Sequence, residues 1–194
     1  MPRAFTDKER SRIRTRLRAV ARTALVSATF RRLTVDTLAR EAGISKGAFY
    51  LFYDTKEALL MELMQEAEAE IREALRKAAG QGLRQVITEM FDGVARNPLL
   101  QALGNPDELA WLERALPDGV LAAARADDDA FAGELLSRLY ASGDIQALVD
   151  PSVFAGIGPA ALALAQHKAL IGEDRYDDVK ALIVEGLTLR LRNG

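Results

Sequence analysis

The stretch Thr34–Tyr53, which reads TVDTLAREAGISKGAFYLFY, decides the fold. Its apolar side chains recur at helical spacing in two short segments, one before Gly43 and one after Ser45. Thr34 and Ser45 are typical helix N-caps, and Gly43 suits the left-handed residue that ends a helix. Two short helices joined by a glycine-containing turn predict a helix-turn-helix, whose second helix enters the DNA major groove.

The second segment is expected to be helical from Lys46 to about Phe52, with one face turned away from the core. Lys46 can contact a phosphate or a guanine edge, Gly47 lets the backbone approach closely, and Tyr50 can donate to a phosphate or pack on a base methyl. The alternative is a plain helical hairpin with a solvated outer face. The residues predicted on this face are Ser45, Lys46, Gly47, Tyr50 and Leu51, with Tyr53 just beyond.

Lys56 stands in the first turn of the next predicted helix, which Thr55 caps. The helix dipole disfavours a cation there, whereas the free N–H groups of a helix N-terminus favour a phosphate. We therefore expect Lys56 to contact the DNA backbone. The alternative is that Glu57 compensates the dipole and that Lys56 is simply solvated.

Helical periodicity continues over the rest of the chain. The helix capped by Thr55 runs to about Ala79, which makes it about 37 Å long, so it should carry the chain from the helix-turn-helix into a second region. Pro159 should kink or restart its helix. The other expected helices are about Asp7–Ala28, Leu83–Arg96, Pro98–Leu103, Pro106–Leu116, Asp118–Arg125, Asp127–Ala141, Pro151–Ile171 and Tyr176–Arg192.

Charge is distributed unevenly along the 194 residues. Residues 1–56 hold 13 basic and 5 acidic side chains, a formal charge of +8, whereas residues 57–194 hold 13 basic and 23 acidic ones, a charge of −10. A basic end on an acidic body is typical of a head that binds a polyanion. The alternative is a solvated basic helix without a partner, because net charge bears weakly on function.

Composition excludes several functions. The chain has no cysteine, and His167 is its one histidine, so thiolate zinc sites, cysteine nucleophiles and multi-histidine metal sites are excluded. No serine stands in a nucleophile elbow, and no glycine loop suits a phosphate, so we expect neither an enzyme nor a bound metal or cofactor. The arginine-rich start does not resemble a signal peptide, and the longest uncharged stretch, Pro151–Gln166, is a poor membrane span. We expect a cytoplasmic protein.

The motif residues resemble the TetR family of bacterial transcriptional regulators over about residues 8–60. The resemblance is carried by Phe30, the run Thr34–Gly43, the run Ser45–Tyr50, Phe52, Thr55-Lys56-Glu57 and Leu59. It implies an all-α fold, with a three-helix DNA-binding head over residues 1–54 and a helical effector-binding and dimerisation body over residues 55–194. It also implies that DNA is touched by Thr34, Thr37, Lys46, Gly47, Tyr50, Leu51 and Lys56.

Two positions depart from the family pattern. Thr29 stands where a glycine often precedes the aromatic residue matched by Phe30, and a β-branched residue resists a left-handed cap. Leu51 replaces a residue that is often polar or basic, so it offers only apolar contact, for example to a thymine methyl. These departures leave the end of the first helix and the base preference open.

The resemblance further implies an effector cavity in the body. The alternative is that the aromatic residues there simply fill the core. Acidic residues at a predicted helix start, as in Asp127–Asp129, are expected to complement the helix dipole rather than to bind a cation. The candidate pocket residues are Phe91, Trp111, Phe131, Tyr140 and His167.

A dimer surface is predicted on the last two long helices. The final helix has a strongly apolar face, and its predecessor is rich in small residues that permit close helix packing, so the two suit an isologous two-fold interface. In the family such helices form a four-helix bundle with a second subunit. The residues predicted in this surface are Gly156, Ala160, Ala163, Val179, Leu182, Ile183 and Leu187.

Together these patterns predict a homodimeric regulator, with repression the favoured mode, that binds a palindromic double-stranded DNA operator and is released by a small-molecule effector of unknown identity. The alternative is a helical metabolite-binding or protein-interaction dimer whose head does not read DNA. No membrane partner is expected.

Overall fold

The computed structural model describes residues 5–27, 32–103, 110–111, 114–116 and 118–193, and within these ranges it contains helices and no strand. The expected all-α fold is therefore confirmed. The elements are α1 (Asp7–Ser27), α2 (Val35–Ala42), α3 (Lys46–Phe49), α4 (Lys56–Ala79), α5 (Leu83–Arg96), α6 (Pro98–Leu103), α8 (Val120–Ala141), α9 (Pro151–Ala155), α10 (Ile157–Gln166), α11 (Lys168–Ile171) and α12 (Tyr176–Asn193).

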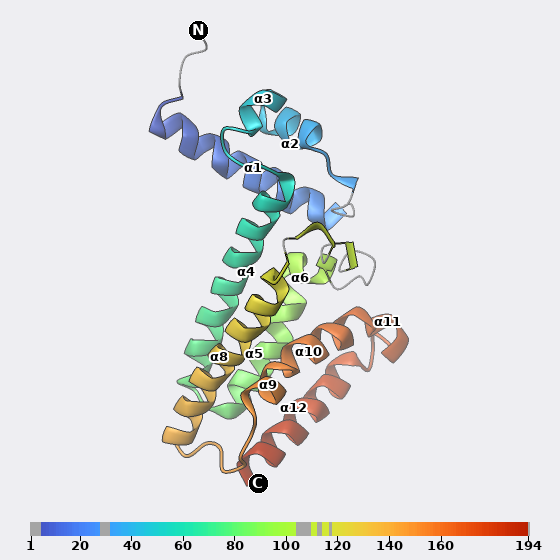
Figure 1. Cartoon of the computed structure of the whole chain (residues 1–194). Coiled ribbons are helices and arrows are strands. Elements are labelled where there is room, and N and C mark those ends of the chain that lie inside the picture. The colour runs from blue at the N-terminus through green and yellow to red at the C-terminus, as the bar shows by residue number, and fades with distance from the viewer. Residues whose placement is uncertain (1–4, 28–31, 104–109, 112–113, 117, 194) are drawn as a thin grey trace.

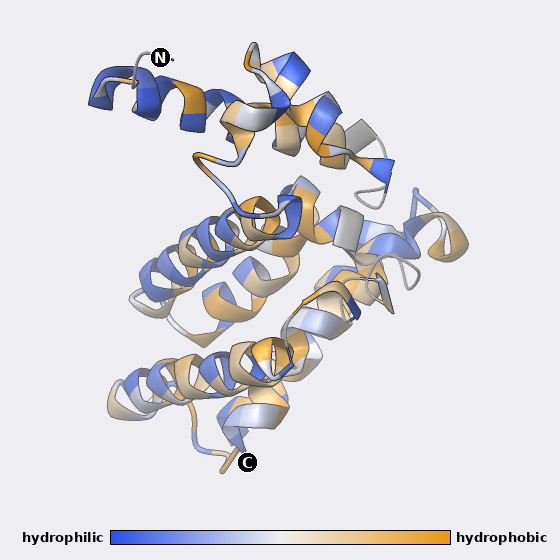
Figure 2. Ribbon diagram, turned by 45° about the horizontal axis from the view of Figure 1, so that its top comes forward, coloured by the Kyte–Doolittle hydropathy of each residue, from blue (hydrophilic) through white to orange (hydrophobic). Residues whose placement is uncertain are grey.

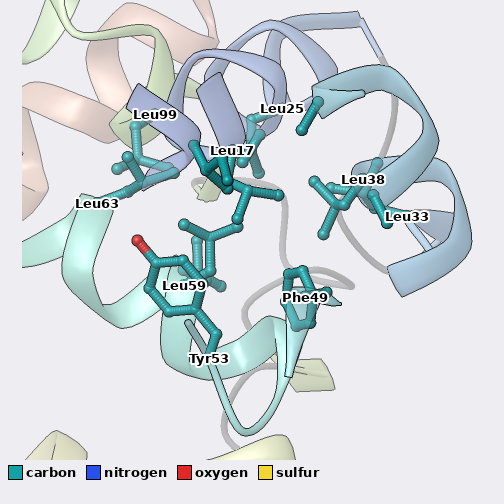
Figure 3. Packing of buried hydrophobic residues seen from close by; sticks show 14 of the residues in the cluster. Leu17, Leu25, Leu33, Leu38, Phe49, Tyr53, Leu59, Leu63 and Leu99 are labelled. Carbon is teal, nitrogen blue, oxygen red and sulfur yellow. The ribbon is translucent and has the colours of Figure 1, made fainter. Parts of the chain in front are cut away.

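The head consists of α1, α2 and α3, and it lies at one end of the molecule, beyond the start of α4 (Figure 1). Its core gathers apolar side chains from all three helices around Leu17, Leu38 and Phe49, which are fully buried. Figure 3 shows these residues converging with Leu25, Leu33 and Leu59. Burying such side chains is the main free energy that holds three short elements together.

The helix α4 connects the head to the body without a break. Its 24 residues span about 36 Å at 1.5 Å per residue. Thr55 accepts a hydrogen bond from the Ala58 N–H and so caps its start. The head core continues past α4 to Leu99 and Leu116, which are buried in the same cluster. Head and body are therefore joined both by a shared helix and by a shared core.

The body packs α5 against α4, α10 and α12, with α8 alongside α4 (Figure 1). A second apolar cluster fills it, with Leu83, Ile87, Leu135, Leu139 and Phe154 fully buried. Figure 2 shows hydrophilic and apolar residues on the same long helices, and in α4 and α5 the apolar ones recur on one side, as amphipathic helices require.

Three expected boundaries were wrong. The helix predicted to reach Phe52 ends at Phe49, and the chain then continues in i→i+3 turns, with Leu51 N–H bonded to Ala48 O and Phe52 N–H to Phe49 O. The two helices predicted on either side of Ala126 are one helix, α8, because no glycine or proline interrupts that segment. Asp127–Asp129 therefore lie in mid-helix rather than at a helix start.

The helix predicted over Pro151–Ile171 is instead three helices, α9, α10 and α11. It restarts at Ile157, which puts Pro159 in the first turn of α10, where its missing N–H costs nothing. The helix predicted over Pro106–Leu116 lies mostly outside the described residues, as do Ala28, Thr29 and Phe30.

Candidate nucleic-acid interface

The geometry of α2 and α3 follows from their caps and one aromatic anchor. Thr34 Oγ1 accepts from the Thr37 N–H at 3.1 Å, and Ser45 Oγ accepts from the Ala48 N–H at 3.1 Å. Gly43 adopts a φ of +75°, the left-handed conformation that ends α2 without strain only for glycine. Phe49 is fully buried and fixes the rotation of α3 about its own axis.

That rotation turns the opposite face of α3 outward. The side chains of Tyr50 and Leu51 are 48% and 57% exposed. A Cβ placed on Gly47 would have no heavy atom within 4 Å, so the backbone of α3 is open to a close approach there. Ser45 and Lys46 are exposed on the same segment. The predicted face therefore exists as a surface.

The ammonium group of Lys46 already has a partner within the protein. Its Nζ donates to Asp36 Oδ2 at 3.2 Å, across the turn between α2 and α3. Both side chains are more than half exposed, so the pair is weak and can exchange its partners. The sequence analysis did not identify Asp36 as part of this face.

Thr34 and Thr37 lie at the start of α2. Their hydroxyl oxygens are 2.9 Å apart, Thr34 is exposed, and Thr37 is partly so. The two hydroxyls therefore stand beside the N–H groups of a helix N-terminus, which is a chemical setting that suits a phosphate.

Tyr53 was wrongly assigned to the exposed face. It is 5% exposed, and Figure 3 shows its ring beside Leu59 in the head core. Its hydroxyl accepts a hydrogen bond from Arg14 Nε at 3.3 Å. Burial is the main reason why the pKa of Tyr53 is raised above its usual value, although Arg14 opposes that shift. The spacing of four residues from Phe49 was the sequence signal that placed Tyr53 on the inner side.

Lys56 is also held within the protein. Its Nζ donates to the Leu33 carbonyl at 2.8 Å, in a partly buried position, and lies 5.0 Å from the centre of the Trp111 ring. The carbonyl and the ring satisfy the ammonium that the helix dipole disfavours. The expected contact of Lys56 with DNA stays a prediction beside these partners.

Three arginines on one side of α1 pair with glutamates of α4, although Arg14 and Arg22 remain about half exposed. Arg14 pairs with Glu62 at 2.9 Å, and Arg22 pairs with Glu66 at 2.9 Å. Arg18 lies between them and contacts both glutamates. We call this row of residues 14, 18 and 22 on α1 and 62, 66 and 70 on α4 the α1–α4 ladder. It removes three cations from the apparent charge excess of the head.

The candidate effector residues are not brought together. Phe91, Phe131 and Tyr140 belong to the body core, where the Tyr140 hydroxyl donates to the Ala147 carbonyl at 2.8 Å. Trp111 instead packs against the head core, and His167 is exposed, with Nδ1 2.8 Å from the Ala163 carbonyl. Phe91, Phe131 and Tyr140 therefore fill the core, which was the alternative to a pocket.

The candidate dimer residues divide into two groups. Gly156, Ala160, Ala163 and Leu182 are exposed, and Leu182 retains 69% of its accessible surface. Val179, Ile183 and Leu187 are partly buried, and the last two pack on the body core. The apolar face that α12 leaves open also includes Leu189, which follows Leu182 at a spacing of seven residues and which the sequence analysis missed.

Two further findings concern the residues that the structure describes. None of their helices is long and apolar enough to cross a membrane. They contain no cluster of three acidic or histidine side chains that could hold a metal ion.

Comparison with known proteins agrees with this geometry. Residues 17–63 match the family of bacterial regulatory proteins of the tetR type. A TetR-family transcriptional regulator from Pectobacterium atrosepticum is 26% identical, with 97% of this chain and 96% of that chain covered and a TM-score of 0.68. No curated protein sequence matches the chain.

Two other solved structures share the fold. The fatty acid degradation regulator FadR from Bacillus halodurans is 19% identical over 99% of this chain and 98% of that chain, with a TM-score of 0.62. FadR from Thermus thermophilus, a TetR-family transcriptional repressor solved with lauroyl-CoA, is 22% identical over 91% and 93%, with a TM-score of 0.56.

Proposed function

Since the chain belongs to the TetR family of bacterial transcriptional regulators, we propose that it acts as a homodimeric repressor that a small-molecule effector releases from a palindromic operator. It is a DNA-binding transcriptional regulator, and its site of action is the cytoplasm, where bacterial DNA lies. Residues 1–54 serve as the DNA-binding domain, and residues 55–194 bind the effector and form the dimer.

The outward face of α3 carries this proposal. Tyr50 and Leu51, in the turn that directly follows α3, are exposed, as is Lys46 at the start of α3, and the buried Phe49 fixes the orientation of the helix. An open backbone at Gly47 lets that helix sit deep in a groove. A face of this kind reads base edges, while Thr34, Thr37, Ser45 and Lys46 bind phosphates and fix the position on the duplex.

A dimer presents two such faces. Leu182 and Leu189 of α12, together with the small residues of α10, form the surface on which a second copy packs. Two recognition helices about one helical turn of DNA apart, roughly 34–36 Å, or somewhat further apart, read a palindrome. An effector then acts by favouring one spacing of the heads over another.

Selection of binding sites from random DNA with the full-length protein tests this function. The protein should enrich a palindrome, and its affinity should fall steeply with salt, because phosphate contacts release counterions. Failure to enrich any sequence would overturn the proposal and favour a dimer that does not read DNA.

A matched pair of variants locates the interface. Lys46 and Lys77 are both exposed lysines paired with one carboxylate, at 3.2 Å and 3.5 Å respectively, but Lys77 lies at the far end of α4. Lys46→Ala should reduce operator affinity and lower the slope of log K against log salt by about 0.9 per lysine, or about 2 per dimer. Lys77→Ala should leave both unchanged. Equal effects from the two variants would contradict this assignment.

A further inference from the structure

A cavity lies where α1 of the head meets α4 and the start of α6. Its volume is about 150 Å³. Its described walls include the side chains of Leu25, Leu63, Ala67 and Leu99, all less than 9% exposed, and Asn97 and Pro98 also line it. Figure 3 shows Leu63 and Leu99 next to one another at this junction. None of the five candidate effector residues of the body lines it.

The size and lining of the cavity restrict what it can hold. A volume near 150 Å³ accommodates a benzene-sized molecule, whereas drug-sized ligands occupy pockets of about 300–1,000 Å³. Four of the wall side chains are aliphatic, and the Oδ1 of the polar one, Asn97, already accepts from the Leu99 and Leu100 N–H groups. An occupant therefore has an apolar body of one small ring or a short branched chain.

Charge at the mouth selects the polar end of that occupant. Arg22 and Glu70 line the mouth, but Arg22 Nη2 is already hydrogen-bonded to Glu66 Oε2 at 2.9 Å. Its distance to Glu70 Oε1 is 3.9 Å, which is too long for a hydrogen bond. Among the described residues no other cation lies within 4.0 Å of Glu70. The carboxylate can accept a new donor, whereas an anion would have to share with Glu66 a guanidinium whose charge Glu66 already balances.

We propose that this cavity binds a small primary amine in its protonated form, with the apolar body between Leu63 and Leu99 and the ammonium on Glu70. This inference rests on the proposed function in one respect, because it makes the cavity an effector site. The binding itself is independent of DNA.

The position of the cavity explains how an occupant changes DNA binding. One wall, Leu25, belongs to α1 of the head, another, Leu99, belongs to α6 of the body, and α4 connects the two parts. An occupant holds α1 and α6 at a fixed separation and draws Glu70 away from the α1–α4 ladder. The affinities for amine and operator are then coupled, and the coupling is reciprocal.

The experiment uses the full-length protein and three probes of one shape: benzylamine, benzyl alcohol and benzoate, titrated by calorimetry near pH 7. Benzylamine should bind about 1.4- to 5-fold more tightly than the other two, because an ion pair with Glu70, whose side chain is 68% exposed, adds about 0.2–1 kcal/mol to burial of the ring. Tighter binding of benzoate would overturn the proposal in favour of an anion site at Arg22. Equal binding of all three, or binding of none, would overturn it as well.

Variants test the two halves of the site separately. Glu70→Gln should reduce the affinity for benzylamine about 1.4- to 5-fold, to that of benzyl alcohol, while Glu73→Gln, an exposed change one turn along the same helix, should have no effect. Ala67→Leu should fill the cavity and abolish binding of all probes. Thermal unfolding checks that Ala67→Leu folds. If Ala67→Leu does not fold, Glu70→Gln still tests the proposal.

The effector role has its own measurement. Saturating benzylamine should change the operator affinity of the wild type about fivefold or more and that of Glu70→Gln much less. If benzylamine binds but operator affinity does not change, the effector role is wrong while the amine site stands. If the protein selects no DNA, the proposed function fails, and the calorimetric result still decides the amine site.

Discussion

Two basic surfaces of the head differ in how far their cations are paired within the protein. On α1, Arg14, Arg18 and Arg22 are neutralised by glutamates of α4, so they attach the head to the body. On α3, Lys46 has a single weak partner, and its aromatic and aliphatic neighbours are exposed. The difference teaches that the number of basic residues says little about a DNA interface, because what matters is whether each cation already has a partner within the protein.

Removing the anchor of α3 should have the largest effect. Phe49→Ala deletes a fully buried ring from the head core and should lower the free energy of unfolding by about 3–5 kcal/mol. Urea unfolding followed by circular dichroism measures this change. Tyr50→Ala, one residue on, should cost less than about 1 kcal/mol, because that side chain is half exposed. If Tyr50→Ala were the more destabilising of the two, the orientation of α3 would be wrong.

Breaking the α1–α4 ladder should have a smaller effect. Arg18→Gln removes contacts with both Glu62 and Glu66, and these partly exposed ion pairs should contribute about 0.2–1 kcal/mol to the free energy of unfolding. Operator affinity measured by fluorescence anisotropy should change less than twofold. A loss as large as that of Lys46→Ala would mean that the arginines of α1 bind DNA, and the contrast between the two surfaces would fail.

Replacing Asp36 should have the opposite effect and increase operator affinity. Asp36→Asn releases Lys46 and removes a negative charge from the face of the helix-turn-helix. Since a surface ion pair contributes about 0.2–1 kcal/mol, operator affinity should rise about 1.4- to 5-fold. Glu73→Gln releases Lys77 in the same way and is the matched control. Weaker binding by Asp36→Asn would show that Asp36 itself accepts a hydrogen bond from DNA.

The buried phenol of Tyr53 should produce the smallest effect, visible at alkaline pH. Its pKa is raised in the folded protein, mainly by burial, so the unfolded chain loses this proton first. The stability that the neutral phenol contributes is complete below the usual tyrosine pKa of about 10 and is lost as the pH rises through the folded value. Tyr53→Phe should therefore flatten the decline of unfolding free energy above pH 10. Tyr176, whose pKa burial also raises, should retain its own part of that decline.

The helix-turn-helix could be predicted from the sequence because its signals are local. Thr34, Gly43 and Ser45 form the caps that their residue types favour. The long helix from Thr55 was predicted on the same grounds. These features depend on residues within a few positions of one another, which a single sequence displays directly.

The fates of Lys56 and the arginines of α1 could not be predicted in this way, whereas Tyr53 had a local signal in its spacing from Phe49. The partners of the others are distant in sequence: Leu33 and Trp111 for Lys56, and the glutamates of α4 for the ladder. The position of Lys56 in a helix start indicated a need for negative charge, but the need is met by a backbone carbonyl rather than a phosphate. Charge in a sequence identifies a group that needs a partner and does not say which partner.

The hydrogen bond from Lys56 to the Leu33 carbonyl also closes a loop. Leu33 directly precedes the cap of α2, and Lys56 is the first residue of α4, so the bond joins the two ends of the segment that contains the whole helix-turn-helix. Because both ends of this segment are bonded to each other at the start of α4, the segment moves as one unit. Whatever tilts the top of α4 therefore swings α2 and α3 together and conserves the angle between them, so the protein can leave its operator with its reading surface intact.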